Sequence, residues 1–466
     1  MATTITQKPL YEQLPAGQDV IFTVANANIV ANQTRVKFVA EVHISPQFPV
    51  NLGTSTNLIG TFKTTPNNEG VGMFDLGSII ENYVKADSEA RNNSSYKGTL
   101  TADDRPHPIH LIDKYSGNIN SFRYLAVKFY VEYLDTSVTP NAITAVDYVS
   151  SDQLQLFNGY SKHTDKLEEF QNDFGYTMGN FNPASAADST KRFLTNAPVT
   201  QYANLEDYGT LSYLAPNGVL DYIKLTYLDS SGSSLGTENI SRTSANGAYN
   251  TYNGYAQMQL IYFGCYPGNL QNWSSTFQAL VTAGTIEGGS IQVRGYDSSD
   301  VTVTKLYTIN VNCPNLKRYS PIRLTWLNQW GAWDYYTFTM KSIRTLSTKG
   351  TTYTQSPGTW NKSTYRISGY KGGEKSFRIN ATEKIRMNTD FVSESEGEWF
   401  EELINSPEVY MLDGFQNDSN YALLNTYVTP VRITTTSYTR KTIANDRLMQ
   451  YTFEIDKSKT LRTQSI

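Results

Sequence analysis

Two segments of this sequence alternate apolar and polar side chains over ten or more residues, which is the spacing of a β-strand with one buried face. In RVKFVAEVHI the residues on the apolar face are Val36, Phe38, Ala40, Val42 and Ile44. In RYLAVKFYVEYL they are Leu125, Val127, Phe129, Val131 and Tyr133. Such alternation favours antiparallel strands packed on one side against a core. We therefore expect an all-β, multidomain fold, built of antiparallel β-sandwich modules with a few short helices.

The length of the chain sets the number of modules. With 466 residues and about 150 residues per domain as a guide, roughly three domains are expected. We predict an N-terminal β-sandwich domain over 1–157, a linker or irregular excursion over 158–193, a central immunoglobulin-like β-sandwich domain over 194–316, and a C-terminal β-rich domain over 317–466. Residues 341–375 are too polar to be buried and predict exposed loops or extended hairpins.

Helix signals are few. The segment SESEGEWFEELINS, at about 393–406, has a capping-box pair in Ser393 and Glu396, and a proline follows it. We expect Glu398, Glu401 and Glu402 to form the solvated face of this helix. A second, shorter helix is expected after Asp75, whose side chain can cap it.

Charge, cysteines and hydropathy exclude several classes of protein. The formal charge is −4 and we find no basic block, so neither nucleic acid nor an anionic membrane is an expected partner. Cys265 and Cys313 could pair as a disulfide, but we favour two buried thiols. No apolar run is long enough for membrane insertion, and the N-terminus has no apolar signal core. We expect a soluble protein synthesised in a cytoplasm.

The segment RLTWLNQWGAWDYYTF, Arg323 to Phe338, concentrates aromatic residues. It predicts a β-hairpin whose loop contains Gly331. Trp326 alternates with an apolar leucine and is expected in the core, whereas Trp330, in the loop, is expected near the surface. Trp330, Trp333 and Tyr335 are the candidates for contact with a ligand such as a carbohydrate or with another subunit, and we favour the subunit contact.

The best metal-like cluster is DDRPHPIH, with Asp103, His107 and His110. An extended proline-rich backbone would place the two histidines on one side. The other interpretation is a solvated proline turn, and the lack of a third histidine or thiol ligand nearby favours it. We predict no bound metal and no cofactor.

Sequence patterns of catalysis are lacking. The chain has no G-x-S-x-G nucleophile elbow, since its match to that spacing, Gly232 to Gly236, lies in a Ser/Gly turn; it also has no cysteine close to a histidine, and only four histidines. GYKGGEKS fails the phosphate-loop pattern because Glu374 occupies the position of the second glycine. We therefore expect no enzymatic activity and no catalytic residue.

Three stretches together resemble structural proteins of tailed bacteriophages. They are Gly60 to Val84, Lys317 to Phe338, and EWFEELINSPEVYML followed by PVRITTTSYTRKTIANDRLMQYTFEIDKS. The resemblance is to virion and tail proteins of phages and prophages of Bacteroidetes-like and marine bacteria, and it covers about a quarter of the chain. It implies assembly into a virion or its tail, and it implies no catalytic residue.

The function expected from these observations is a non-enzymatic component of a tailed phage virion, most simply a tail protein. Its partners would be further copies of itself in a symmetric oligomer and other tail proteins, and its location would be the virion tail. The alternative is a receptor-binding or adhesin tail protein that recognises host surface polysaccharide. A polysaccharide depolymerase is a third hypothesis, for which the sequence nominates no pair of acids.

Overall fold

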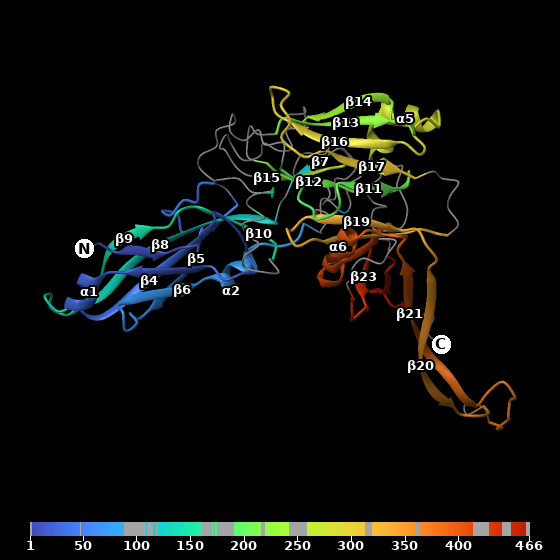
Figure 1. Ribbon diagram of the computed structural model, residues 1–466. Coiled ribbons are helices and arrows are strands. Elements are labelled where there is room, and N and C mark those ends of the chain that lie inside the picture. Colours follow the sequence, from blue (N-terminus) through green and yellow to red (C-terminus); the bar gives the residue numbers. More distant parts are fainter. Residues whose placement is uncertain are drawn as a thin grey trace. The chain divides into compact units, whose positions relative to one another are not determined.

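The protein consists mostly of strands, arranged in several antiparallel sheets with a few short helices, as the computed structural model shows (Figure 1). This confirms the all-β, multidomain class. The described residues are 2–46, 48–87, 109, 115–117, 120–160, 170, 173–174, 191–215, 220–241, 259–312, 319–359, 363–412, 428–439 and 449–462.

These residues form two compact units. The first contains the described residues up to 312 and the loop Leu327–Asp334, and the second contains the described residues 319–326 and those from 335 onward. The predicted division into three domains stays a prediction.

The first unit begins with two sheets packed face to face. The smaller sheet consists, in spatial order, of β1 (Thr4–Gln7), β3 (Ile21–Ala25) and β6 (Val71–Asp75). The larger consists of β2 (Gln13–Pro15), β10 (Leu154–Phe157), β8 (Phe122–Asp135), β4 (Thr34–Ser45) and β5 (Leu58–Thr64), with β9 (Ala142–Ser150) also paired to β8. The rings of Phe22 and Phe74 lie 5.4 and 5.7 Å from Phe129 of the larger sheet. These contacts join the two sheets into a sandwich.

The apolar faces predicted for β4 and β8 are largely buried in this sandwich, but the opposite face is buried as well at Val39, His43 and Ala126. The two strands pair antiparallel with Val42 opposite Val127, and both side chains are fully buried. The helix expected after Asp75 is present as α2 (Gly77–Ile80), followed by the 3-10 turn η1 (Glu81–Tyr83). The Asp75 carboxylate accepts a hydrogen bond from the Gly77 amide at 3.0 Å. The short helix α1 (Ala27–Asn32) precedes β4.

A second pair of sheets follows in the same unit. One consists of β11 (Thr200–Ala203), β17 (Tyr307–Val311), β16 (Ser290–Tyr296), β13 (Tyr222–Leu228) and β14 (Ser234–Ser241). The other consists of β12 (Leu211–Ala215), β15 (Gln259–Phe263) and β7 (Tyr115–Gly117), and the helices α4 (Pro267–Trp273) and α5 (Ser275–Thr282) follow β15. Phe193 lies between the two sheets, with its ring 5.9 Å from Tyr213 and 5.0 Å from Tyr307. Cys265 is free and buried, as expected, and burial raises the pKa of its thiol; Cys313 lies outside the described residues.

The second unit is built on an eight-stranded sheet. Its order is β19 (Trp333–Phe338), β18 (Ile322–Leu327), β22 (Val409–Leu412), β23 (Val428–Ile433), β24 (Thr452–Lys457), β21 (Gly373–Asn388) and β20 (Ile343–Gln355), with β25 (Leu461–Arg462) beside β21. The helix α6 (Glu394–Asn405) packs on this sheet, because Trp399 lies 4.9 Å from Trp326 and Phe400 lies 5.5 Å from Phe453. Trp326 is fully buried, as predicted.

The predicted capping box of α6 is confirmed. The Ser393 side chain accepts from the Glu396 amide, and the Glu396 carboxylate accepts from the Ser393 amide. The expectation of a solvated glutamate face is wrong for Glu402, which is 3% exposed. Glu402 is three residues from Trp399 and therefore lies on the helix face that is turned toward the core. None of the helices in the described part of the chain is long and apolar enough to cross a membrane.

Candidate functional site

Trp330, the residue expected near the surface, is buried. It is 3% exposed, so the surface expectation is wrong. Its indole lies 5.1 Å from Phe170, 5.5 Å from Phe174 and 6.4 Å from Phe157, measured between ring centres. These rings come from a stretch about 150 residues earlier in the chain, which no local pattern around Trp330 reveals.

The loop that carries Trp330 is held by one asparagine. The Asn328 side-chain oxygen accepts hydrogen bonds from the backbone amides of Trp330 and Ala332, each at 3.0 Å. Its side-chain nitrogen donates to the carbonyl of Leu194 at 2.9 Å and to the Asp334 carboxylate at 3.1 Å. One side chain thus closes the turn and ties it to the segment that precedes β11.

Gly331 makes this turn possible. Its φ is +79°, in the left-handed region that favours glycine. A Cβ added at this position would lie 2.3 Å from the carbonyl oxygen of Asn158. The sequence predicted the hairpin and its glycine, but the close approach of residue 158 follows only from the fold.

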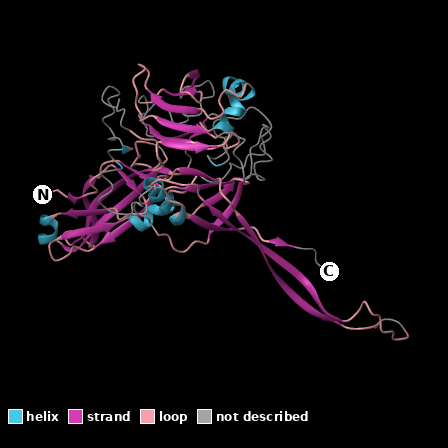
Figure 2. Cartoon of the chain, turned by 45° about the vertical axis from the view of Figure 1, so that its right-hand side comes forward, coloured by secondary structure: helices cyan, strands magenta, loops and turns pink. Residues whose placement is uncertain are grey.

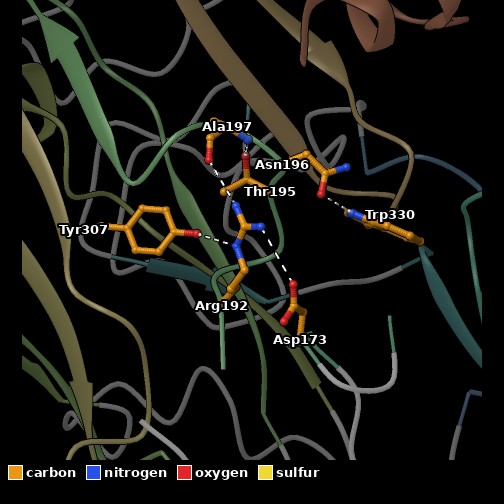
Figure 3. A network of polar contacts seen from close by, with 7 residues as sticks. All are labelled: Asp173, Arg192, Thr195, Asn196, Ala197, Tyr307 and Trp330. Atoms are coloured by element: carbon orange, nitrogen blue, oxygen red, sulfur yellow. Dashed lines mark hydrogen bonds and ion pairs between the residues drawn. The ribbon is translucent and has the colours of Figure 1, made fainter. Parts of the chain in front are cut away.

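Arg192 lies at the centre of a polar network next to this loop (Figure 3). Its guanidinium donates to the carbonyl of Ala197 at 3.3 Å and to the Tyr307 hydroxyl at 3.5 Å, and it forms an ion pair with Asp173 at 3.8 Å. Burial raises the pKa of Tyr307, and the charge of Arg192 opposes that shift. In the same region the Trp330 indole N–H donates to the side-chain oxygen of Asn196 at 3.1 Å (Figure 3).

This network has the character of a structural site. Its groups donate to and accept from one another, and the aromatic rings beside it fill the adjoining core. Trp333 and Tyr335 are also buried, at 1% and 4% exposure. The guanidinium of Arg323 lies 5.3 Å from the centre of the Tyr335 ring, within the second unit. All three side chains are packed inside the chain that carries them. That Trp330, Trp333 and Tyr335 contact a ligand or another subunit stays a prediction.

The metal candidates Asp103, His107 and His110 lie outside the described residues. Among the residues that the structure does describe, no group of three or more histidine, cysteine, aspartate and glutamate side chains is placed to hold a metal ion.

In the described part of the chain, the hairpin of β20 and β21 is exposed along most of its length, which confirms the prediction for the described residues of 341–375. The two strands pair antiparallel from Ile343 opposite Arg386 to Gln355 opposite Gly373. β24 flanks β21 only over Lys384–Asn388, and β25 adds two further residue pairs. Beyond that point the two strands run on as a two-stranded ribbon (Figures 1 and 2). We refer to residues 347–382 as the arm.

Large apolar side chains on the arm face solvent. Ile367 is 78% exposed, Tyr370 75%, Tyr365 48% and Phe377 45%. These four side chains lie within 13 residues of sequence, and exposed apolar surface, where it is contiguous, marks sites that bind a partner. The arm is therefore the part of the described surface best suited to recognition.

The arm also differs in net charge from the rest of the chain. It contains six basic residues and one acidic residue, a formal charge of +5; since the whole chain carries −4, the remainder carries −9. The basic residues are Lys349, Lys362, Arg366, Lys371, Lys375 and Arg378. Sequence analysis missed this because the cations are spaced among polar residues and form no block. Net charge summed over the predicted hairpin would have found it.

Comparison with known proteins does not assign this chain to a family. No protein-family profile matches the chain, and no curated protein sequence matches it. Solved structures with some similarity include the native conformation of alpha-2-macroglobulin from E. coli, with 7% identity and a TM-score of 0.17, over 82% of this chain and 21% of that one. Another is protocadherin gamma B7 extracellular cadherin domains 1–4, with 8% identity and a TM-score of 0.10, over 83% and 72%. The chain thus spans about a fifth of the first of these, and scores this low carry no argument.

Proposed function

We propose that this chain is a non-enzymatic structural component of a tailed phage virion, most simply a tail protein that assembles into a symmetric oligomer. The phage assignment is supported by the resemblance of the three sequence stretches. The assembly role is supported by the all-β, multidomain architecture and by the arm.

The arm is the observation that carries the proposal. Two strands of 13 and 16 residues extend well past the strands that flank them. A two-stranded ribbon is at best marginally stable in water, because it buries little apolar surface. A partner that covers the ribbon supplies the missing burial, and a symmetric assembly supplies such a partner in every copy.

A second candidate function is the recognition of host surface polysaccharide, and the same arm favours it. Tyr365 and Tyr370 lie in the segment that connects β20 to β21 and are exposed. Exposed aromatic rings bind sugars by stacking. The buried Trp330 and Tyr335 no longer support this alternative, so it depends on the arm alone.

The test compares the full chain with an arm-shortened variant. In this variant Asn-Gly replaces residues 350–379, so a two-residue type I′ turn joins Lys349 to Asn380, which are opposite each other in the ribbon. We expect the full chain to elute as an oligomer of its 52.3 kDa mass in light scattering, with closed symmetry in electron micrographs. The variant should be monomeric with an unchanged melting temperature.

A full chain that stays monomeric at all accessible concentrations would contradict the assembly role. Quenching of its tyrosine and tryptophan fluorescence by host polysaccharide, lost with Tyr370→Ala, would then support the second function. Hydrolysis of glycan or peptide by homogeneous protein would contradict the non-enzymatic assignment.

A further inference from the structure

Within the described part of the chain, the cations of the arm that the structure places have no acidic partner. Five of them, at positions 349, 366, 371, 375 and 378, lie in the described residues, and none forms an ion pair there. Their polar contacts are instead with backbone oxygens: Lys371 donates to the Gly358 carbonyl at 3.4 Å, and Lys375 donates to the Tyr370 carbonyl at 3.0 Å. These five cations, beside the single acidic residue Glu374, can therefore attract an acidic partner outside the chain.

The outer edge of β20 is also open. In the described part of the chain β20 pairs with β21 alone, along 13 residues. Such an edge presents backbone N–H and C=O groups that a protein partner can pair with. The register shift at Thr351 and Thr352 interrupts the edge part of the way along, which limits pairing between long, identical edges.

The open edge of β20, the exposed apolar side chains of the arm and the net charge of the arm together indicate what kind of partner it binds. Open backbone groups and the exposed Ile367 and Phe377 suit a protein surface better than a polyanion. The charge disfavours a symmetric pairing of arm with arm, because each arm carries a formal +5 and like charges placed together are unfavourable. The remainder of a second copy carries −9 and is complementary.

We infer that the arm of one copy binds the acidic body of a second copy, in a head-to-tail contact rather than a two-fold one. This inference rests on the proposed assembly function and adds its geometry. A contact between two different surfaces repeats from copy to copy, so it produces a closed ring or a helical filament, whereas a two-fold contact stops at a dimer.

The first experiment reverses charge on the arm. Lys349→Glu/Arg366→Glu changes two exposed side chains whose cationic groups make no hydrogen bond within the described chain. We expect at least about tenfold weaker association, and the association of the unchanged protein should weaken as ionic strength rises from about 0.05 M to about 0.5 M. The control Lys37→Glu/Lys459→Glu makes the same change in net charge at exposed sites outside the arm, and it should associate normally.

The second experiment separates head-to-tail from two-fold contact. A fluorescently labelled arm-shortened copy retains the acidic body, so it should join oligomers of the full chain and, when in excess, end their growth. In a two-fold contact between arms, the labelled copy would stay monomeric beside dimers of the full chain, and the inference would be overturned.

The remaining outcomes are distinguishable. If the arm-shortened protein alone still forms the oligomer, the assembly function stands and the inference fails. If the full chain is monomeric at all concentrations, the assembly function fails as well. If a monomeric full chain binds polyphosphate through Lys349 and Arg366, a polyanion is the partner, and the inference is overturned.

Discussion

Gly331 shows how a single residue connects distant parts of the first unit. Its positive φ allows the turn that directs Trp330 toward the phenylalanine cluster, and its lack of a Cβ leaves room for the Asn158 carbonyl. Gly232 has a similar φ of +84°, but a Cβ added there would meet nothing within 4 Å. Substituting each of the two glycines therefore distinguishes the cost of backbone strain alone from the cost of strain combined with a steric conflict.

We predict that Gly331→Ala lowers the free energy of unfolding by about 2–4 kcal/mol, the sum of left-handed strain and a forced displacement of backbone. Gly232→Ala should cost only about 1 kcal/mol, because it meets the strain alone. Urea denaturation of both variants measures the difference. Equal costs would show that residue 158 does not confine Gly331.

The burial of His43 and the pKa of its imidazole also depend on the residues around it. The alternation of β4 places it opposite the apolar face, yet it is 3% exposed; Val42, His43 and Ile44 are all buried, so both faces of the strand are covered here. Neither ring nitrogen has a hydrogen-bond partner in the described structure. Burial lowers the pKa of His43 below its ordinary 6.5, although nearby Glu41 acts against the shift.

The pH dependence follows from this direction. As pH falls below about 6.5, the unfolded chain takes up a proton at His43 more readily than the folded chain, so the folded state loses stability. We predict that His43→Leu reduces the loss of stability between about pH 7.5 and about pH 5. Chemical denaturation at both pH values measures it. An unchanged loss in the variant would mean that His43 titrates alike in both states.

At the scale of elements, α6 begins where its local sequence directs. The capping box satisfies backbone amides at the N-terminus of the helix, and Trp399 and Phe400 then attach the helix to the sheet of the second unit. Local hydrogen bonding thus sets the start of the element, and packing sets its orientation.

We predict that Ser393→Ala lowers the stability of the second unit by about 1 kcal/mol, since the Glu396 amide loses its acceptor. Ser393→Asp should retain most of the stability, because aspartate is an equally good N-cap. Thermal or urea unfolding of both variants, followed by tryptophan fluorescence, provides the comparison. Equal destabilisation by the two substitutions would contradict a capping role.

At the scale of the whole molecule, the distribution of charge is the main property. By residue count, a chain near neutrality overall divides into a basic arm and an acidic remainder, and this is the asymmetry on which the inferred head-to-tail contact depends. Because the arm makes few contacts with its own unit, we expect the folding of the sheets to be independent of it.

We also predict that folding needs no metal. Incubation with EDTA should leave the melting temperature unchanged, since a chelator destabilises a protein only if a bound ion stabilises its folded state. A lower melting temperature that is restored by a divalent cation would direct attention to Asp103, His107 and His110. Alanine substitutions at these positions would then locate the ion.

Local sequence pattern was sufficient to predict an element wherever the residues that define the element are close in sequence. The strands β4 and β8, the capped helix α6, the Gly331 hairpin and the exposed β20–β21 ribbon all follow from alternation, capping residues or polarity within one segment. The hydrogen bonds of the helix and of the turn join neighbours in sequence. Those between β4 and β8 join residues as distant as Val42 and Val127, but the apolar face of each strand still repeats with the period of the element.

Which side chains are buried, and which distant side chains lie together, depended on the tertiary structure. Trp330 is enclosed by rings from residues 157–174, Glu402 is turned inward with Trp399, and His43 is covered on a face that its strand alone marks as polar. The cations at 349, 375 and 378 are carried by one ribbon only because β20 folds back on β21. In each case the environment of a side chain is made by residues far away in sequence, which period and composition do not encode, so the sequence by itself determined the elements and the fold decided the sites.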